Sequence, residues 1–119
     1  MPFDEDVARR VRACLAGRPA LEERRMFGGL AFLLGGHMTA GVVGEELMLR
    51  VGPEAYDEVL RRPHVREMDF TGTPLRGLVF LEPAGFRSER DLRAWLARAE
   101  AFVAGLPPKS AKKRSKRSS

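Results

Sequence analysis

The sequence predicts an α+β fold: an antiparallel sheet of about five strands with helices packed on one face, in the order α-β-β-β-α-β-β-α. Two observations predict it. Helical apolar spacing occurs at both ends of the chain, and glycine-rich turns separate short alternating apolar segments between them. The 119 residues suit one core, because single domains of about 100 to 150 residues are typical. We expect one domain over residues 1–108 and a disordered tail over residues 109–119.

The N-terminal segment predicts a helix that begins after Asp4 and ends near Ala16. Asp4 has a side chain suited to capping, and the apolar residues that follow fall on one helical face. Gly17 ends the helix in the expected way. Residues 22–34 then predict an approach segment followed by one strand, in which apolar residues alternate.

A tight hairpin is predicted next. Gly35 and Gly36 can both adopt positive φ, which the favoured two-residue hairpin turns require. Residues 37–43 form the returning strand of this hairpin. Residues 47–51 form a third strand after a turn, so three antiparallel strands follow one another directly.

The second half predicts a short helix, two strands and a long final helix. The short helix runs over residues 53–61 and has Pro53 at its first position, where a missing N–H costs nothing. Residues 65–70 and 78–82 predict strands. Ser88 opens the last helix, which ends near Ala104. Its apolar stripe contains Leu92, Trp95, Leu96, Ala99, Phe102 and Val103.

The outer face of the predicted sheet is also apolar. Such a face needs a cover, and a second copy of the chain would supply one. We therefore predict a homodimer. The residues assigned to this face are Ala31, Leu33, Met48, Val79 and Leu81.

Charge is divided unevenly along the chain. Residues 1–108 carry 15 Arg, no Lys and 16 acidic residues, a net charge of −1. Residues 109–119 carry four Lys, two Arg and no acidic residue, a net charge of +6. The net charge of +5 is therefore a property of the tail, and it does not indicate that the folded surface binds nucleic acid.

Several protein classes are not expected. The acidic N-terminus has no apolar run behind it, as an export signal would, and no segment approaches the roughly 18 apolar residues of a membrane-spanning helix. The single cysteine, Cys14, excludes an internal disulfide and a multi-cysteine zinc site. We expect a cytoplasmic protein without a membrane partner, metal or cofactor.

Several motifs together resemble the TfoX/Sxy N-terminal domain family, named after bacterial regulators of natural competence. The segment from Arg24 to Phe32, with its Arg-Arg-Met-Phe-Gly-Gly run, resembles the opening motif of that family. The likeness spans roughly Val7 to Val103. Its further parts are the hairpin Gly36-His37-Met38, the strands Glu46 to Val51 and Leu78 to Pro83, and the helix start Asp91 to Trp95.

The resemblance implies the same order of helices and strands as the periodicity does. It also implies a transcription-associated regulatory role, since the family is known for coactivation of competence genes. Full-length regulators of this family carry a second, C-terminal helical domain. In this sequence the basic tail takes the place of that domain.

The motif itself has two interpretations. In the functional one, Arg24 and Arg25 offer forked donors to a phosphate, carboxylate or protein partner, and the glycines allow close approach. In the structural one, Phe27 anchors the strand in the core and the glycines form a bulge. We favour the structural interpretation. The motif residues are Arg24, Arg25, Met26, Phe27, Gly28 and Gly29.

No catalytic constellation is present. The glycine pairs lack the Lys-Ser/Thr and helix start of a phosphate loop. Cys14 could in principle pair with His37 or His64, but it lies on an apolar helical face, where cysteine usually packs as a small hydrophobe. We expect a protein that is not an enzyme.

The tail has two interpretations of equal weight. Its cations could follow a phosphate backbone and give weak, sequence-independent affinity for nucleic acid, or they could remain solvated. The candidate nucleic-acid-binding residues are Lys109, Lys112, Lys113, Arg114, Lys116 and Arg117.

The leading hypothesis is a non-enzymatic regulatory protein whose domain contacts a protein partner, such as the transcription machinery, and whose tail keeps it near nucleic acid. One alternative is a ligand-binding or enzymatic domain that uses the region of Arg24 and Arg25. Another is a structural homo-oligomer.

Overall fold

Six antiparallel strands form one sheet in the order β1-β2-β3-β4-β6-β5. The computed structural model describes residues 3–26, 28–68 and 76–106. The fold class is as predicted, with one strand more than expected. The strands are β1 (Leu21–Met26), β2 (Gly29–Leu34), β3 (His37–Val43), β4 (Glu46–Arg50), β5 (Val65–Glu67) and β6 (Leu78–Leu81).

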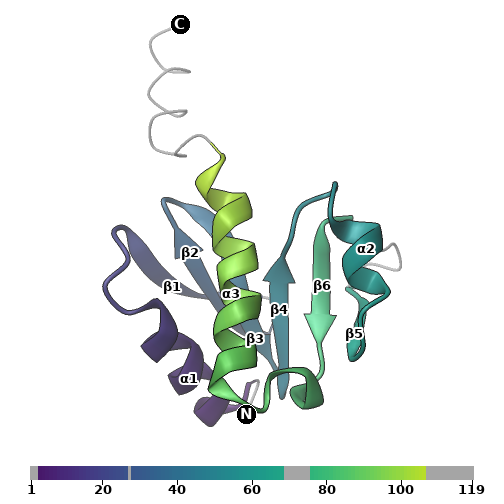
Figure 1. Cartoon of the computed structure of the whole chain (residues 1–119). Helices are drawn as coiled ribbons and strands as arrows, with labels where there is room; N and C mark the ends of the chain where they lie inside the picture. The colour runs from purple at the N-terminus through teal and green to yellow at the C-terminus, as the bar shows by residue number, and fades with distance from the viewer. Residues whose placement is uncertain (1–2, 27, 69–75, 107–119) are drawn as a thin grey trace, which may run out of the picture.

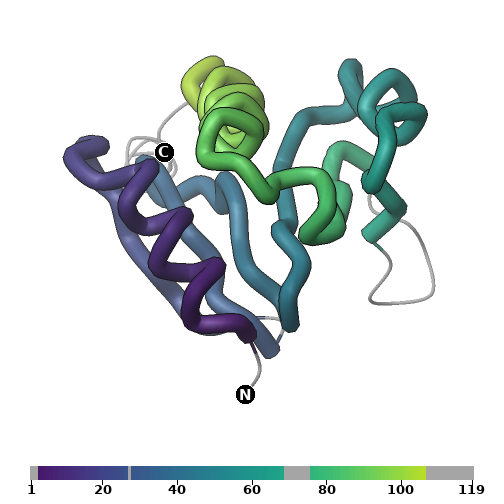
Figure 2. The backbone as a smooth tube through the Cα atoms, turned by 60° about the horizontal axis from the view of Figure 1, so that its bottom comes forward, coloured from purple at the N-terminus to yellow at the C-terminus, as the bar shows by residue number. Residues whose placement is uncertain are grey.

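The helices cover one face of this sheet, as the sequence predicts. Helix α3 crosses the sheet, α1 lies beside β1 and β2, and α2 lies at the β5 and β6 end (Figure 1). Figure 2 shows all three on the same side of the curved strands. They are α1 (Glu5–Leu15), α2 (Tyr56–Leu60) and α3 (Glu89–Ala104), and a 3₁₀ turn, η1 (Pro83–Phe86), precedes α3.

Two caps begin the long helices at the predicted positions. Asp4 Oδ1 accepts hydrogen bonds from the backbone N–H groups of Asp6 and Val7, at 2.8 and 3.1 Å. Ser88 Oγ accepts one from the N–H of Asp91 at 3.0 Å. Each cap satisfies donors that the first helical turn leaves without an intrahelical partner.

The main core lies between the sheet and the helices. Alternate residues of the strands point into it, as the period of two requires. Its strand residues are Leu30, Phe32, Ala40, Val42, Leu47, Leu49, Val79 and Leu81, and its helix residues include Val7, Val11, Leu15, Val59, Leu92, Leu96 and Ala99. Trp95 is only partly buried where it packs against this core. The fully buried face of α3 is therefore narrower than the apolar stripe that the sequence predicts.

The sequence did not indicate strand β1. Residues 22–25 are all exposed, so this edge strand has no apolar alternation. It pairs with β2 over its whole length, from Leu21 opposite Leu34 to Met26 opposite Gly29. The predicted bulge at the glycines is wrong, because Gly28 has φ +72° between the two strands and the register shift lies between Phe32 and Leu33. Phe27 lies outside the described residues.

The hairpin of β2 and β3 is confirmed. Gly35 and Gly36 have φ of +60° and +85°, and Leu34 pairs with His37 across the turn. These are the left-handed conformations that a two-residue turn of this kind requires. The tip of this hairpin forms one wall of a surface groove.

The short helix is shorter than predicted. It begins at Tyr56, after a turn over residues 53–55, so Pro53 does not occupy its first position. Strand β5 covers only the first half of the strand predicted over residues 65–70, and the end of that prediction lies outside the described residues. Both differences arise at element ends, which sequence patterns locate least well.

The homodimer was predicted because five apolar residues were assigned to an uncovered outer face of the sheet. The structure does not support that assignment. Val79 and Leu81 belong to the main core, and Phe80 takes the outer position beside Met48 and Met68. Strand β6 is apolar on both faces, so its sequence does not indicate which face points inward. The five residues assigned outward, Ala31, Leu33, Met48, Val79 and Leu81, are at most 4% exposed within one chain. Homodimerisation stays a prediction without this support.

Candidate binding sites

The two arginines of the opening motif point to opposite faces of β1, as consecutive strand residues do. The guanidinium of Arg25 lies 5.7 Å from the ring centroid of Phe3, which belongs to the main core. Arg24 donates to Glu22 Oε2 at 2.8 Å and lines a cavity on the other side. The two side chains therefore do not converge on one ligand, and only Arg24 contributes to a site.

We call this hollow the arginine cavity. It has a volume of about 390 Å³ and lies where β2 and β4 end and β3 and β6 begin. Three arginines line it together with apolar side chains, and none of its lining residues is acidic. The lining is Arg24, Met26, Leu33, Gly36, Met38, Arg50, Gly52, Pro53, Arg76, Gly77, Leu78 and Phe102.

The arginines of this cavity differ in their partners. Arg76 donates to both carboxylate oxygens of Asp57, at 3.3 and 3.4 Å. Arg50 has no carboxylate within 4.0 Å among the described residues. Its Nη1 donates a long hydrogen bond of 3.4 Å to the Met38 carbonyl, and its guanidinium lies 5.6 Å from the Phe102 ring centroid. Arg50 is thus the arginine of the cavity whose charge is least compensated.

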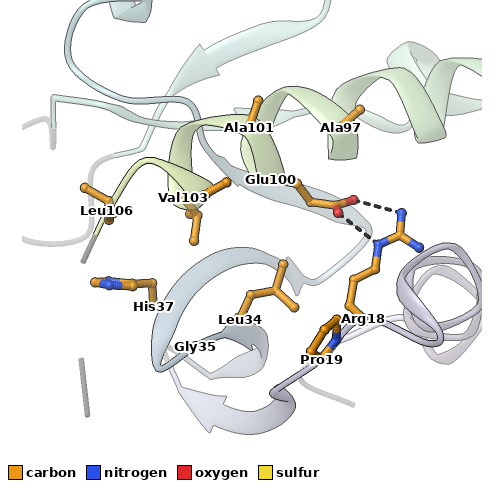
Figure 3. Close-up of a pocket in the computed structure, with 11 residues that line it drawn as sticks. Arg18, Pro19, Leu34, Gly35, His37, Ala97, Glu100, Ala101, Val103 and Leu106 are labelled. Atoms are coloured by element: carbon orange, nitrogen blue, oxygen red, sulfur yellow. Dashed lines mark hydrogen bonds and ion pairs between the residues drawn. The ribbon is translucent and has the colours of Figure 1, made fainter. Parts of the chain in front are cut away.

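A second hollow, the helix–hairpin groove, separates the C-terminal half of α3 from the tip of the β2–β3 hairpin (Figure 3). Its volume is about 510 Å³. Small and aliphatic residues of α3 form one wall, and Leu34 and His37 form the other. The lining is Arg18, Pro19, Leu34, Gly35, His37, Ala97, Glu100, Ala101, Val103, Ala104 and Leu106.

An ion pair closes one end of this groove. Arg18 donates from Nε and Nη2 to the two carboxylate oxygens of Glu100, at 2.9 and 3.3 Å (Figure 3). These hydrogen bonds raise the pKa of the Arg18 guanidinium. The groove is therefore apolar along its length and polar at this rim, a pattern typical of surfaces that accept an apolar segment.

The titratable groups do not form a reactive site. Cys14 is buried in the main core, where desolvation raises the pKa of its thiol and so lowers its reactivity. His37 is buried in the wall of the groove, while His64 is exposed. Within residues 3–26, 28–68 and 76–106, no group of three or more potential metal ligands occurs.

The folded domain neutralises most of its own positive charge. Nine of its 15 arginines lie within 4.0 Å of a carboxylate in the part of the chain that the structure describes. Exposed pairs of this kind add little stability, but they reduce the local positive potential. The tail residues predicted to bind nucleic acid, at positions 109–119, lie outside the described residues.

The comparison with protein families gives a match over most of the chain: a model of the TfoX N-terminal domain matches residues 13–103. The chain belongs to this family. The match supports a regulatory domain of the type found in competence regulators. Searches of curated proteins and of solved structures gave no significant match.

No helix in the described part of this TfoX N-terminal domain is long and apolar enough to cross a membrane. The sequence indicated Arg24 as a site residue, but it gave no sign of Arg50 or Arg76. These arginines are isolated in the sequence, and only the pairing of β4 with β6 brings them together. Their positions follow from sheet register, which a spacing pattern does not reveal.

Proposed function

We propose that this TfoX N-terminal domain is a non-enzymatic, transcription-associated regulator whose folded part binds a protein and whose tail holds it near nucleic acid. The observation that carries the proposal is the division of charge. The described arginines are mostly paired with carboxylates, whereas the sequence of residues 109–119 contains six cations and no acid.

Phosphate contacts by unpaired Lys and Arg release counterions and give affinity without sequence preference. A tail of six cations would make log affinity fall with log salt at a slope of about −5, which is about 0.9 per contact. Such a tail concentrates the protein on DNA or RNA. It leaves the choice of target to the folded domain.

The helix–hairpin groove is the surface that we propose for the protein partner. Ala97, Ala101 and Ala104 are exposed on α3 and open onto it. Small residues on an exposed helix leave room for the apolar side chains of another protein. The proposed occupant is a short apolar segment of the transcription machinery.

Two variants of the full chain test this proposal with purified RNA polymerase and duplex DNA. Ala101→Arg places a long cation in the groove and should abolish binding to the polymerase. Ala94→Arg, on an exposed part of the same helix outside the groove, should leave it unchanged. Equal binding by both variants would contradict the role of the groove.

Replacement of the tail cations by Gln tests the second part. This change should remove salt-sensitive retention on immobilised DNA and leave the melting temperature unchanged. Retention that survives the change would assign DNA binding to the folded domain. The replaced residues are Lys109, Lys112, Lys113, Arg114, Lys116 and Arg117.

A further inference from the structure

We propose that the arginine cavity binds a small organic anion, a carboxylate or phosphate ester carried on a short apolar body. This site is separate from the helix–hairpin groove and from the tail. It therefore adds a ligand to the proposed function and does not depend on it.

Backbone pairing fixes the cavity. Arg50 ends β4 opposite Leu78 of β6, and the N–H groups of Val51 and Gly52 donate to the carbonyl of Gly77 at 2.8 and 3.1 Å. These bonds place Arg76 beside the end of β4. Arg24 reaches the same hollow from β1. Cationic side chains from three separate segments thus line one concave surface.

The charges around this surface do not cancel. Three guanidinium groups line the cavity, and among the described residues only two carboxylates, Glu22 and Asp57, pair with them. Both of these pairs are more than half exposed on each side, and exposed pairs are weak. Arg24 and Arg76 can therefore turn toward an incoming anion at small cost, while Arg50 has no carboxylate partner in the part of the chain that the structure describes. Guanidinium groups suit oxyanions because their forked N–H donors match two oxygens at once.

The remaining lining residues are apolar, which is why we propose a ligand with an apolar body. Leu33, Met38 and Leu78 contribute aliphatic surface, and Phe102 contributes a ring that the guanidinium of Arg50 partly covers. A volume of about 390 Å³ lies within the range of small-molecule sites, about 300 to 1,000 Å³. An inorganic anion would leave this apolar surface without a partner, and a neutral apolar molecule would leave the arginines without one.

A purely structural role for Arg50 is the competing explanation. Its stacking on Phe102 shields an aromatic ring at the end of α3, and a cation–π contact contributes stability on its own. That role requires no selectivity for anions. The test therefore measures selectivity as well as the effect of substitution.

Amide NMR of the full chain, titrated with phenyl phosphate, tests the proposal for a phosphate ester. A second arm of the experiment, a titration with phenylacetate, tests it for a carboxylate. We expect saturable shifts at Gly36, Gly52 and Gly77. Benzyl alcohol and inorganic phosphate should bind at least about tenfold more weakly, because each lacks one of the two parts that the cavity contacts. The arm that binds more tightly identifies the anion class.

Substitutions then locate the site. Arg50→Gln and Arg76→Gln should each weaken the binding of phenyl phosphate about tenfold, as expected when a charged hydrogen bond is lost. Arg93→Gln, on an exposed pair with Glu89 on α3, removes the same charge away from the cavity and should change nothing. Arg76 is more than half exposed, so its variant remains a valid test if Arg50→Gln does not fold.

Three results would overturn the proposal. One is equal affinity for benzyl alcohol and phenyl phosphate. Another is equal weakening by Arg93→Gln, which would indicate an effect of overall charge. The third is a set of shifts confined to residues after 106, which would assign anion binding to the tail.

Discussion

Gly52 lies directly against the ring of Phe102: a β-carbon added at position 52 would stand 2.5 Å from the Cδ1 atom of that ring. The contact joins the end of β4 to the last turns of α3. Gly52 also has φ +90°, a conformation that side chains rarely adopt. Both walls of the arginine cavity therefore depend on a glycine at this position.

We predict that Gly52→Ala lowers the free energy of unfolding by about 2 to 4 kcal/mol, since a steric clash adds to backbone strain. Gly44→Ala is the matched control, because Gly44 has φ +58° but open space around it. It should cost about 1 kcal/mol. Urea denaturation measures the free energy of unfolding of both variants. Equal losses would show that the contact with the Phe102 ring adds nothing to the cost of Gly52→Ala.

The cap of α1 gives a second prediction. Asp4→Ala removes the acceptor of two backbone N–H groups and should cost about 1 kcal/mol. Asp4→Asn keeps an acceptor oxygen and should cost less than half of that. Chemical denaturation of the three proteins checks this, and an Asn variant as unstable as the Ala variant would contradict the role of the cap.

The ion pair of Arg12 with Glu23 gives a pH dependence. Its hydrogen bonds lower the pKa of the Glu23 carboxyl below its ordinary value of 4.5. The folded state therefore holds this proton more weakly than the unfolded state does. The stabilisation is present above pH 4.5 and is lost as the pH falls through the lowered pKa.

Glu23→Gln should thus reduce stability at pH 7, and this loss should shrink as the pH falls below 4.5. The pair is partly exposed, so the difference should stay within about 1 kcal/mol. Thermal unfolding of both proteins across this pH range measures it. A difference that grows toward low pH would have the wrong sign for this account.

The burial of Cys14 predicts slow chemistry at its thiol. Desolvation raises the thiol pKa, and only the thiolate reacts. Labelling with a thiol reagent at pH 8 should therefore be slow in the native protein and become fast when urea unfolds it. Native labelling as fast as in urea would contradict the packing of α1 on the core.

Patterns that one strand or helix carries by itself were predictable. Gly35 and Gly36 indicated their hairpin because a two-residue turn needs positive φ, and the cap at Ser88 indicated the start of α3. Strand β1 was missed, since the polar residues 22–25 form an exposed edge that neighbouring hydrogen bonds define. The inner face of β6 was assigned wrongly because Val79 and Phe80 are equally apolar.

The candidate sites depended even more on tertiary structure. Arg24 belonged to a visible motif, and its isolated partners Arg50 and Arg76 did not. Sheet register brings them together, and one residue of slip would move Arg50 to the other face. The groove likewise combines α3 with a hairpin from the first third of the sequence, a proximity that no local pattern encodes.

The salt dependence of binding to duplex DNA tests the division of charge most directly. Two triple variants with the same net charge are compared with the parent chain. One replaces Lys112, Lys113 and Arg114 of the tail by Gln. The other replaces three exposed arginines of the domain by Gln, namely Arg61, Arg87 and Arg90.

We predict that the tail variant makes the slope of log affinity against log salt about 2.7 units shallower, since each phosphate contact contributes about 0.9. The domain variant should keep the parent slope. Equal changes in both variants, or a change confined to the domain variant, would contradict the assignment of nucleic-acid binding to residues 109–119.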